Sequence, residues 1–261
     1  MSMDQRPDNQ RDLERNRPER IGALATEVLT VLRDRQGVTV GGARPFVSEH
    51  LYRAILTKGH FDAGGLLAQL RGHRVTLDTI VDLYIPQAAG RLGTDWVDDG
   101  LTFADVTIGA LRLQALLGET TMQVRMDSFH HNAHMVAMVI VPRGEQHFLG
   151  AQVVAAQLRR LGCEVVMSYD ESLGMLGARL MAENPDLLLI TCCSEETVKS
   201  VSQTVQAVRK ALHNPPPIFL GGGMVNDKKN LIERTGVDKL SNSAVEAVTY
   251  VTEQRSSALS P

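Results

Sequence analysis

The sequence predicts an α/β protein in which an N-terminal helical bundle precedes a five-stranded, doubly wound parallel sheet. Residues 21–119 carry apolar side chains at helical spacing and show no clear strand pattern. From residue 135 onward, short apolar runs alternate with amphipathic segments, which is typical of repeated strand–helix units. Five such units fit into the remaining chain, and this number favours an open parallel sheet covered by helices on both faces.

The N-terminal half divides into a polar arm, a bundle and a linker. Residues 1–20 balance arginines against acidic residues with almost nothing apolar, so we expect a mobile arm. Residues 21–119 read as four or five helices with short connections, a small bundle. Their segments are "IGALATEVLTVLRD", "FVSEHLYRAILTK", "LLAQLRG", "TLDTIVDLYIPQAAGRLGTDWVDDG" and "LTFADVTIGALRLQALLGE". Residues 120–134 are polar and are expected to link the bundle to the sheet domain at 135–255.

The strand–helix units follow one another without a break. The predicted strands are residues 135–142, 164–169, 186–192, 217–223 and 238–242, and the helices between and after them are 148–162, 172–184, 194–212, 228–236 and 243–255. Gly162 is expected to end the first of these helices and Ser194 to cap the third. Ligands of such sheets bind at the carboxyl ends of the strands. That rule gathers four segments along one rim: Glu145–Gly150, Thr191–Cys193, Gly221–Gly223 and Ser241–Asn242.

Composition and charge exclude several classes of protein. A net charge of −3 gives no overall reason to expect nucleic-acid binding, and no helix-turn-helix segment precedes the bundle. The longest apolar run is too short to cross a membrane, and the first residues lack the apolar region of a secretory signal. Three cysteines do not make a disulfide framework. We therefore expect a cytoplasmic protein that binds neither membranes nor, by itself, DNA.

The loop after the first strand, "RGEQHFLG", is the segment most suggestive of chemistry. It lacks the glycines of a dinucleotide-binding loop, and the third strand ends without the aspartate of a phosphorylated receiver. Its histidine could simply cap or pack against the following helix. Alternatively, His147 is a metal ligand, Glu145 fixes its tautomer, and Gly150 gives a bulky ligand access to the helix start. One histidine cannot hold a bare ion, so the metal would arrive inside a macrocycle.

These residues resemble the pattern of the cobalamin-binding domains. That family has D-x-H-x-x-G in the first loop, S-x-L after the third strand and G-G after the fourth. Here the corresponding residues are E-Q-H-F-L-G at 145–150, T-C-C at 191–193 and G-G-G at 221–223. The resemblance implies a flavodoxin-like, Rossmann-type fold and makes His147 the lower axial ligand of cobalt. Around the nucleotide tail it places Thr191, Cys193, Gly221, Gly222 and Ser241.

The bundle extends the resemblance to residues 75–250. Helical caps of corrinoid proteins carry L-G-x-x-W, and "LGTDWVDDG" places Trp96 where that tryptophan covers the upper corrin face. The Glu-His pair that follows in light-sensing and methyl-transferring relatives is replaced by Val106 and Thr107, and Val97 stands where some photoreceptors have a histidine. Such a degraded cap is similar to that of the AerR and PpaA antirepressors of purple photosynthetic bacteria. The resemblance implies a non-enzymatic, light-responsive regulator that controls photosynthesis genes through a partner repressor of the CrtJ/PpsR type.

Three other functions stay open at this point. A corrinoid carrier in methyl transfer would share the two-domain layout, a mutase subunit would lack the bundle, and a heme sensor could use the same axial histidine. The hydroxo, methyl and adenosyl forms of cobalamin are equally compatible with the sequence.

Two further clusters have simpler explanations. His130, His131 and His134 lie in the linker, where a His-rich polar connection is favoured over a metal site or an upper ligand of cobalt. Cys192 and Cys193 are adjacent, and adjacent cysteines rarely form a disulfide; we expect them to pack near the cofactor tail.

Overall fold

The computed structural model describes residues 42–127, 135–226 and 230–259. The chain divides into two units, residues 1–50 and 51–261. The predicted arm and first helix, the three linker histidines, Lys228 and Lys229 lie outside the described residues. Within the described ranges, no helix is long and apolar enough to cross a bilayer.

The helical region consists of α3 (Pro45–Leu56), α4 (Ala63–Gly72), α5 (Leu77–Thr79), α6 (Ile85–Val97) and α7 (Phe103–Asp127). A π-helical turn, Ile80–Tyr84, joins α5 to α6. It ends two residues before Pro86, whose ring and missing N–H disturb a regular helix at this point. α7 continues to Asp127, so residues 120–127, which the sequence analysis assigned to the linker, are helical.

Buried leucines and polar contacts hold these helices together. Arg112 on α7 donates to the main-chain oxygens of Ile55 and Gly59 at distances of 2.8 Å, which satisfies carbonyls at and beyond the end of α3. The Tyr52 hydroxyl donates to Asp95 on α6 at 2.6 Å. The fully buried side chains include Leu67, Leu70, Ile80, Ile85, Leu113 and Leu116.

The second half forms the predicted parallel sheet. Its strands are β1 (Val136–Val141), β2 (Glu164–Tyr169), β3 (Leu187–Thr191), β4 (Ile218–Gly221) and β5 (Lys239–Leu240). They lie in the order β2-β1-β3-β4-β5, and each neighbouring pair is parallel. From β1 the chain adds β2 on one side and then β3 on the other, so the strand order reverses between β1 and β3. Doubly wound folds bind ligands at this position. The predicted fold class is therefore confirmed.

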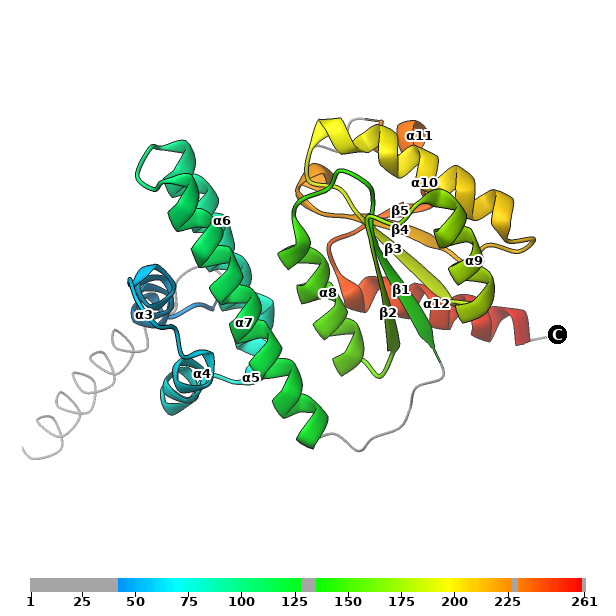
Figure 1. The fold of residues 1–261 in the computed structure, drawn as a ribbon. Helices are drawn as coiled ribbons and strands as arrows, with labels where there is room; N and C mark the ends of the chain where they lie inside the picture. The colour runs from blue at the N-terminus through cyan, green and yellow to red at the C-terminus, as the bar shows by residue number, and fades with distance from the viewer. Residues whose placement is uncertain (1–41, 128–134, 227–229, 260–261) are drawn as a thin grey trace, which may run out of the picture. The chain divides into compact units, whose positions relative to one another are not determined.

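Helices cover both faces of this sheet (Figure 1). α8 (Phe148–Arg160) and α12 (Ala244–Leu259) pack on one face, and α9 (Leu173–Glu183), α10 (Val198–Ala211) and α11 (Leu231–Thr235) on the other. Alternate residues of β1 and β3 enter the two cores, as the strand period requires. Ala137 and Val139 face α8 and α12, whereas Met138 and Ile140 face α9 and α10.

Two predicted helix boundaries can be compared with the structure. Gly162 directly follows the C-cap of α8 with φ +87°, a left-handed conformation that suits glycine. Ser194 precedes a short 3-10 turn, Glu195–Thr197 (η3), and its side chain makes no capping bond. The prediction that Ser194 caps the long helix was wrong, because α10 begins at Val198 after that extra turn.

Candidate functional site

The loop between β1 and α8 turns sharply before it presents its histidine. The Glu145 N–H donates to the carbonyl of Pro142 at 3.1 Å, and Gly144 has φ +85°. A glycine with positive φ at the third position of a four-residue turn is typical of a type II turn. The turn brings Glu145 back under the carboxyl end of the sheet, where it is 4% exposed. His147, two residues later, is the N-cap residue of α8.

Glu145 is a buried carboxylate surrounded by donors. Its Oε1 accepts from the N–H groups of Gln146 and His147 at 2.9 and 3.0 Å and lies 2.5 Å from His147 Nδ1. Its Oε2 accepts from the Cys193 N–H at 2.8 Å and from the Thr197 hydroxyl at 3.2 Å. This one side chain therefore joins the loop after β1 to the loop after β3.

These bonds decide the charge state of the pair. Burial raises the pKa of Glu145, but hydrogen bonds from the His147 ring and from the N–H groups of Cys193 and His147 outweigh it and lower the pKa from 4.5 to about 2. The hydrogen bond to Glu145 raises the pKa of His147 above 6.5, against the opposing effect of burial. Glu145 is therefore an anion throughout the neutral range.

The ionised carboxylate also fixes the imidazole tautomer. A carboxylate is only an acceptor, so His147 Nδ1 carries the proton and donates it. In the neutral ring this leaves the lone pair on Nε2, and among the described residues none forms a hydrogen bond with that atom. The side chain is 63% exposed. The arrangement matches that of a metal-bound histidine, whose second nitrogen donates to a carboxylate.

The end of β3 adds an unpaired hydroxyl to this edge. Thr191 is 7% exposed, and its buried Oγ1 forms no hydrogen bond with any residue that the structure describes. By alternation along the strand, Thr191 belongs to the face of Leu187 and Leu189, which α8 and α12 cover. A buried hydroxyl without a partner costs free energy, so an unpaired Thr191 indicates a missing polar group at this position.

The loop after β4 is shaped by glycines and by Asn242. Gly222 has φ +108°, and a Cβ there would lie 2.4 Å from the Cys192 carbonyl oxygen. The Asn242 amide accepts from the Gly222 N–H at 2.7 Å and donates to the Gly222 carbonyl at 3.3 Å. A Cβ on Gly221 would lie 3.1 Å from the Ser241 carbonyl. The contacts that require glycine at these two positions are thus with the protein's own backbone.

The remaining predicted residues lie in different places. Gly150 is in the first turn of α8 with open space where a side chain would be. The Ser241 hydroxyl lies 2.5 Å from Glu246 on α12 and accepts from the Ser243 N–H, so it is occupied by the helix start. Trp96 lies on α6 and is 50% exposed, and its indole makes no hydrogen bond or ring contact with a described residue.

The structure brings Glu145, His147, Thr191 and Cys193 to one edge and adds two residues that sequence reasoning missed. Thr197 reaches Glu145 from the 3-10 turn before α10. Asn242 lies on the predicted rim but was not singled out. A hydroxyl residue at the start of the helix after the third strand, and an asparagine facing a run of glycines, are the signals that point to these roles.

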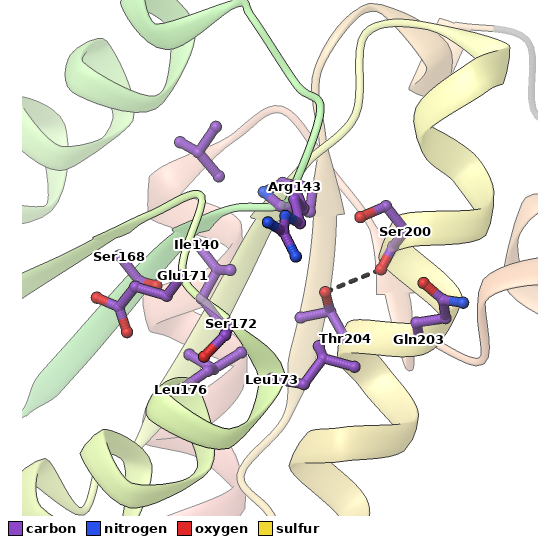
Figure 2. Close-up of a pocket in the computed structure, with 12 residues that line it drawn as sticks. Ile140, Arg143, Ser168, Glu171, Ser172, Leu173, Leu176, Ser200, Gln203 and Thr204 are labelled. Carbon is purple, nitrogen blue, oxygen red and sulfur yellow. Dashed lines mark hydrogen bonds between the residues drawn. The ribbon is translucent and has the colours of Figure 1, made fainter.

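A separate cavity of about 110 Å³ lies on the other face of the sheet, between β1, α9 and α10 (Figure 2). The Arg143 guanidinium points toward it, with Leu173 and Thr204 on the far side. Thr204 donates to the Ser200 carbonyl at 2.8 Å. Sites for drug-sized ligands occupy roughly 300–1,000 Å³, so this cavity is too small for a nucleotide. None of Glu145, His147 and Thr191 lines it.

Known proteins share this architecture. The B12 binding domain family matches residues 135–249. A 20.5 kDa protein of the bchF–crtJ intergenic region of Rhodobacter capsulatus is 33% identical over 177 residues, which cover 68% of this chain and 92% of that protein. The structure of the Methanosarcina barkeri monomethylamine corrinoid protein has a TM-score of 0.64 at 15% identity, covering 80% of this chain and 96% of its own. At that identity the likeness shows the fold alone.

These matches confirm the family predicted from the E-x-H-x-x-G loop and the glycine run. The matched domain begins at the residue where the sheet was predicted to begin, and the Rhodobacter relative aligns over nearly its whole length. The chain belongs to the cobalamin (B12)-binding domain family, in the group that includes the Rhodobacter capsulatus protein of the bchF–crtJ region.

Proposed function

We propose that the protein binds cobalamin through His147 and acts as a light-responsive, non-enzymatic regulator of photosynthesis genes. Cobalamin binding is supported above all by the His147–Glu145 pair. The buried Glu145 carboxylate accepts a hydrogen bond from Nδ1 of His147 and leaves Nε2 accessible. Cobalamin, when bound there, would supply a cobalt centre that responds to light and to redox state.

The donor set at the rim fits this cofactor. His147, once its Nε2 is deprotonated, would offer cobalt one nitrogen, and a macrocycle would supply the other metal ligands that the chain lacks. The unpaired Thr191 hydroxyl offers a hydrogen bond to the polar nucleotide tail. Gly150, with open space beside it, leaves room at the helix start. Each feature is accounted for by a large ligand with polar and apolar parts.

The residues that would hold cobalamin have different roles. Glu145 keeps the His147 ring in one tautomer and orientation. Thr197 and the Cys193 N–H hold Glu145, so that displacement of the carboxylate disturbs the loop after β3 as well. A change in the bond to His147 can reach β3 and α10 along these hydrogen bonds, and a partner protein would recognise the difference.

The proposed regulatory role is supported by the Rhodobacter relative and by the sequence of the helical region. The Rhodobacter relative is named for its place beside crtJ, which agrees with the CrtJ/PpsR-type repressor that the family resemblance implies as partner. Val106 and Thr107 on α7 replace the Glu-His pair of the light-sensing and methyl-transferring relatives. An antirepressor role is favoured over methyl transfer because that pair is missing.

The cofactor half is tested by the absorption spectrum of purified protein after incubation with hydroxocobalamin, adenosylcobalamin or heme, followed by gel filtration. Wild type and His213→Ala are expected to retain corrinoid, whereas His147→Ala loses it. His213 is the matched control because it is exposed and precedes β4, so that it lies at the amino-terminal end of the strands, away from His147 at their carboxyl end. Retention of heme and not of corrinoid would contradict the proposal, as would full retention by His147→Ala.

The regulatory half is tested by adding the loaded protein, dark or illuminated, to a CrtJ/PpsR-type repressor bound to its operator DNA. We expect illumination to change how strongly the protein releases the repressor, and His147→Ala to abolish the difference. Equal effects of wild type and His147→Ala on the repressor would refute cobalamin-dependent regulation. Corrinoid retention with no effect on the repressor would refute the antirepressor role alone.

A further inference from the structure

Cys193 lies beside the Glu145–His147 pair; its N–H donates to Glu145 Oε2, and its thiol is free of any disulfide. A carboxylate oxygen, an imidazole nitrogen and the Cys193 sulfur all lie within 4.8 Å of one another. Among the described residues, these three are the ones whose potential ligand atoms lie close enough together to share one metal ion. Cys193 is partly exposed, whereas Cys192 and Cys163 are buried.

The three atoms form a ligand set with a definite preference. Zinc is held by sulfur, nitrogen and oxygen at about 2.0–2.3 Å, so ligands in a tetrahedral site lie roughly 3.3–3.8 Å from one another. Oε1 and Nδ1 lie 2.5 Å apart and the three ligand groups within 4.8 Å of one another, so an entering ion would separate Oε1 from Nδ1 and draw the sulfur toward them. A thiolate favours Zn²⁺ over Mg²⁺ or Ca²⁺, and three protein ligands leave a fourth position for water.

The charge at this position also suits a cation. Glu145 is 4% exposed, and its carboxylate contacts N–H and O–H donors and the His147 ring. No ion pair with a described lysine or arginine is present at Glu145. One carboxylate and one thiolate neutralise a divalent cation, which avoids a net charge at a half-buried site.

We propose that the protein without corrinoid binds Zn²⁺ through Glu145 Oε1, His147 Nδ1 and Cys193 Sγ, and that bound zinc blocks cobalamin uptake. The ion takes the place of the proton between Oε1 and Nδ1. That proton moves to Nε2 through solvent, and the thiol proton of Cys193 is released to solvent. Nε2 then carries a hydrogen and has no lone pair for cobalt. The proposed block of cobalamin uptake depends on the proposed role of His147 as the cobalt ligand, whereas zinc binding does not.

Zinc binding is tested with Co²⁺, which substitutes for Zn²⁺ and is coloured. Apo-protein titrated with Co²⁺ is expected to show intense visible bands of a tetrahedral centre and a near-ultraviolet thiolate charge-transfer band, both removed by Zn²⁺. Cys193→Ser abolishes the charge-transfer band, and Cys163→Ser and His213→Ala retain it. Absence of the band in wild type, or its persistence in Cys193→Ser, overturns the site.

A measurement on wild type alone covers the case in which Cys193→Ser misfolds. Zn²⁺ is expected to protect Cys193 from alkylation by iodoacetamide, located by fragment-ion mass spectrometry that separates it from Cys192. Equal alkylation of Cys193 with and without Zn²⁺ also overturns the site.

Blocking is tested by cobalamin uptake of wild type at increasing Zn²⁺. Simple competition predicts that Zn²⁺ at ten times its own Kd weakens apparent cobalamin affinity about tenfold, and that a chelator restores it. Mg²⁺ at the same concentration is the control and has no effect. Cobalamin uptake unaffected by saturating Zn²⁺ overturns the blocking. If His147→Ala abolishes the Co²⁺ bands but still takes up cobalamin, the proposed function fails while the zinc site stands.

Discussion

Replacement of Glu145 by glutamine tests whether this carboxylate organises the rim. A pKa lowered from 4.5 to about 2 corresponds, at 1.36 kcal/mol for each pKa unit, to about 3 kcal/mol in favour of the ionised form in the folded apo-protein. Glutamine keeps the size but lacks the charge, and its NH₂ group would face donors. We therefore expect Glu145→Gln to lower the free energy of unfolding by about 3 kcal/mol at neutral pH.

The pH dependence separates this charge effect from a packing defect. Because the pKa of Glu145 is lower in the folded state, its stabilisation is present above 4.5 and is lost as the pH falls toward about 2. The difference between wild type and Glu145→Gln should therefore shrink in acid. Glu145→Asp keeps the charge and the family's own residue, and should retain most of the stability.

The assay is urea unfolding of apo-protein followed by far-ultraviolet circular dichroism, at neutral pH and at about pH 3. Glu183→Gln, which removes an exposed carboxylate at the end of α9, is the matched control and should match wild type within about 0.5 kcal/mol. A Glu145→Gln variant as stable as wild type at neutral pH would refute the reasoning. A deficit that does not change with pH would assign the effect to packing.

Four further outcomes are expected. Gly222→Ala should destabilise the protein by at least about 2 kcal/mol, because of its φ of +108° and the close carbonyl of Cys192, and thermal unfolding measures this. Thr191→Val should stabilise apo-protein by about 1 kcal/mol, because it removes an unpaired hydroxyl, yet weaken cobalamin binding about fivefold in an equilibrium titration. Asn242→Ala should weaken cobalamin binding by freeing the loop around Gly222; unchanged affinity would show that the loop keeps its shape unaided. The raised pKa of His147 stabilises apo-protein below 6.5, and this increment should disappear as the pH rises through the folded pKa, so His147→Ala should flatten that part of the stability profile.

The sheet domain could be predicted because its pattern is local. Each strand is a short buried run bounded by turn residues, and each helix repeats at its own period, so β1 to β5 were found from the sequence. The sequence did not show that α7 runs on to Asp127, since the polar stretch after residue 119 resembles a linker. Such a stretch remains helical when no proline or glycine interrupts it.

The site was predictable in its outline and not in its contacts. His147 and Glu145 stand out because an E-x-H-x-x-G loop follows a buried strand. That Glu145 also binds the Cys193 N–H and Thr197 depends on how closely the loops after β1 and β3 approach, and this distance has no sequence signal. The Thr191 hydroxyl was expected near the tail from family resemblance, whereas its lack of a partner is visible only in three dimensions.

The account depends most on His147 as the nitrogen that binds cobalt, and electron paramagnetic resonance of the protein loaded with cob(II)alamin tests this directly. Protein made with nitrogen-15-labelled histidine is compared with unlabelled protein. If His147 is the axial ligand, the superhyperfine splitting changes from triplets to doublets on labelling, because the nuclear spin of the coordinated nitrogen changes. Triplets that persist in labelled protein would show that the cofactor keeps its own base on cobalt, and would contradict the account.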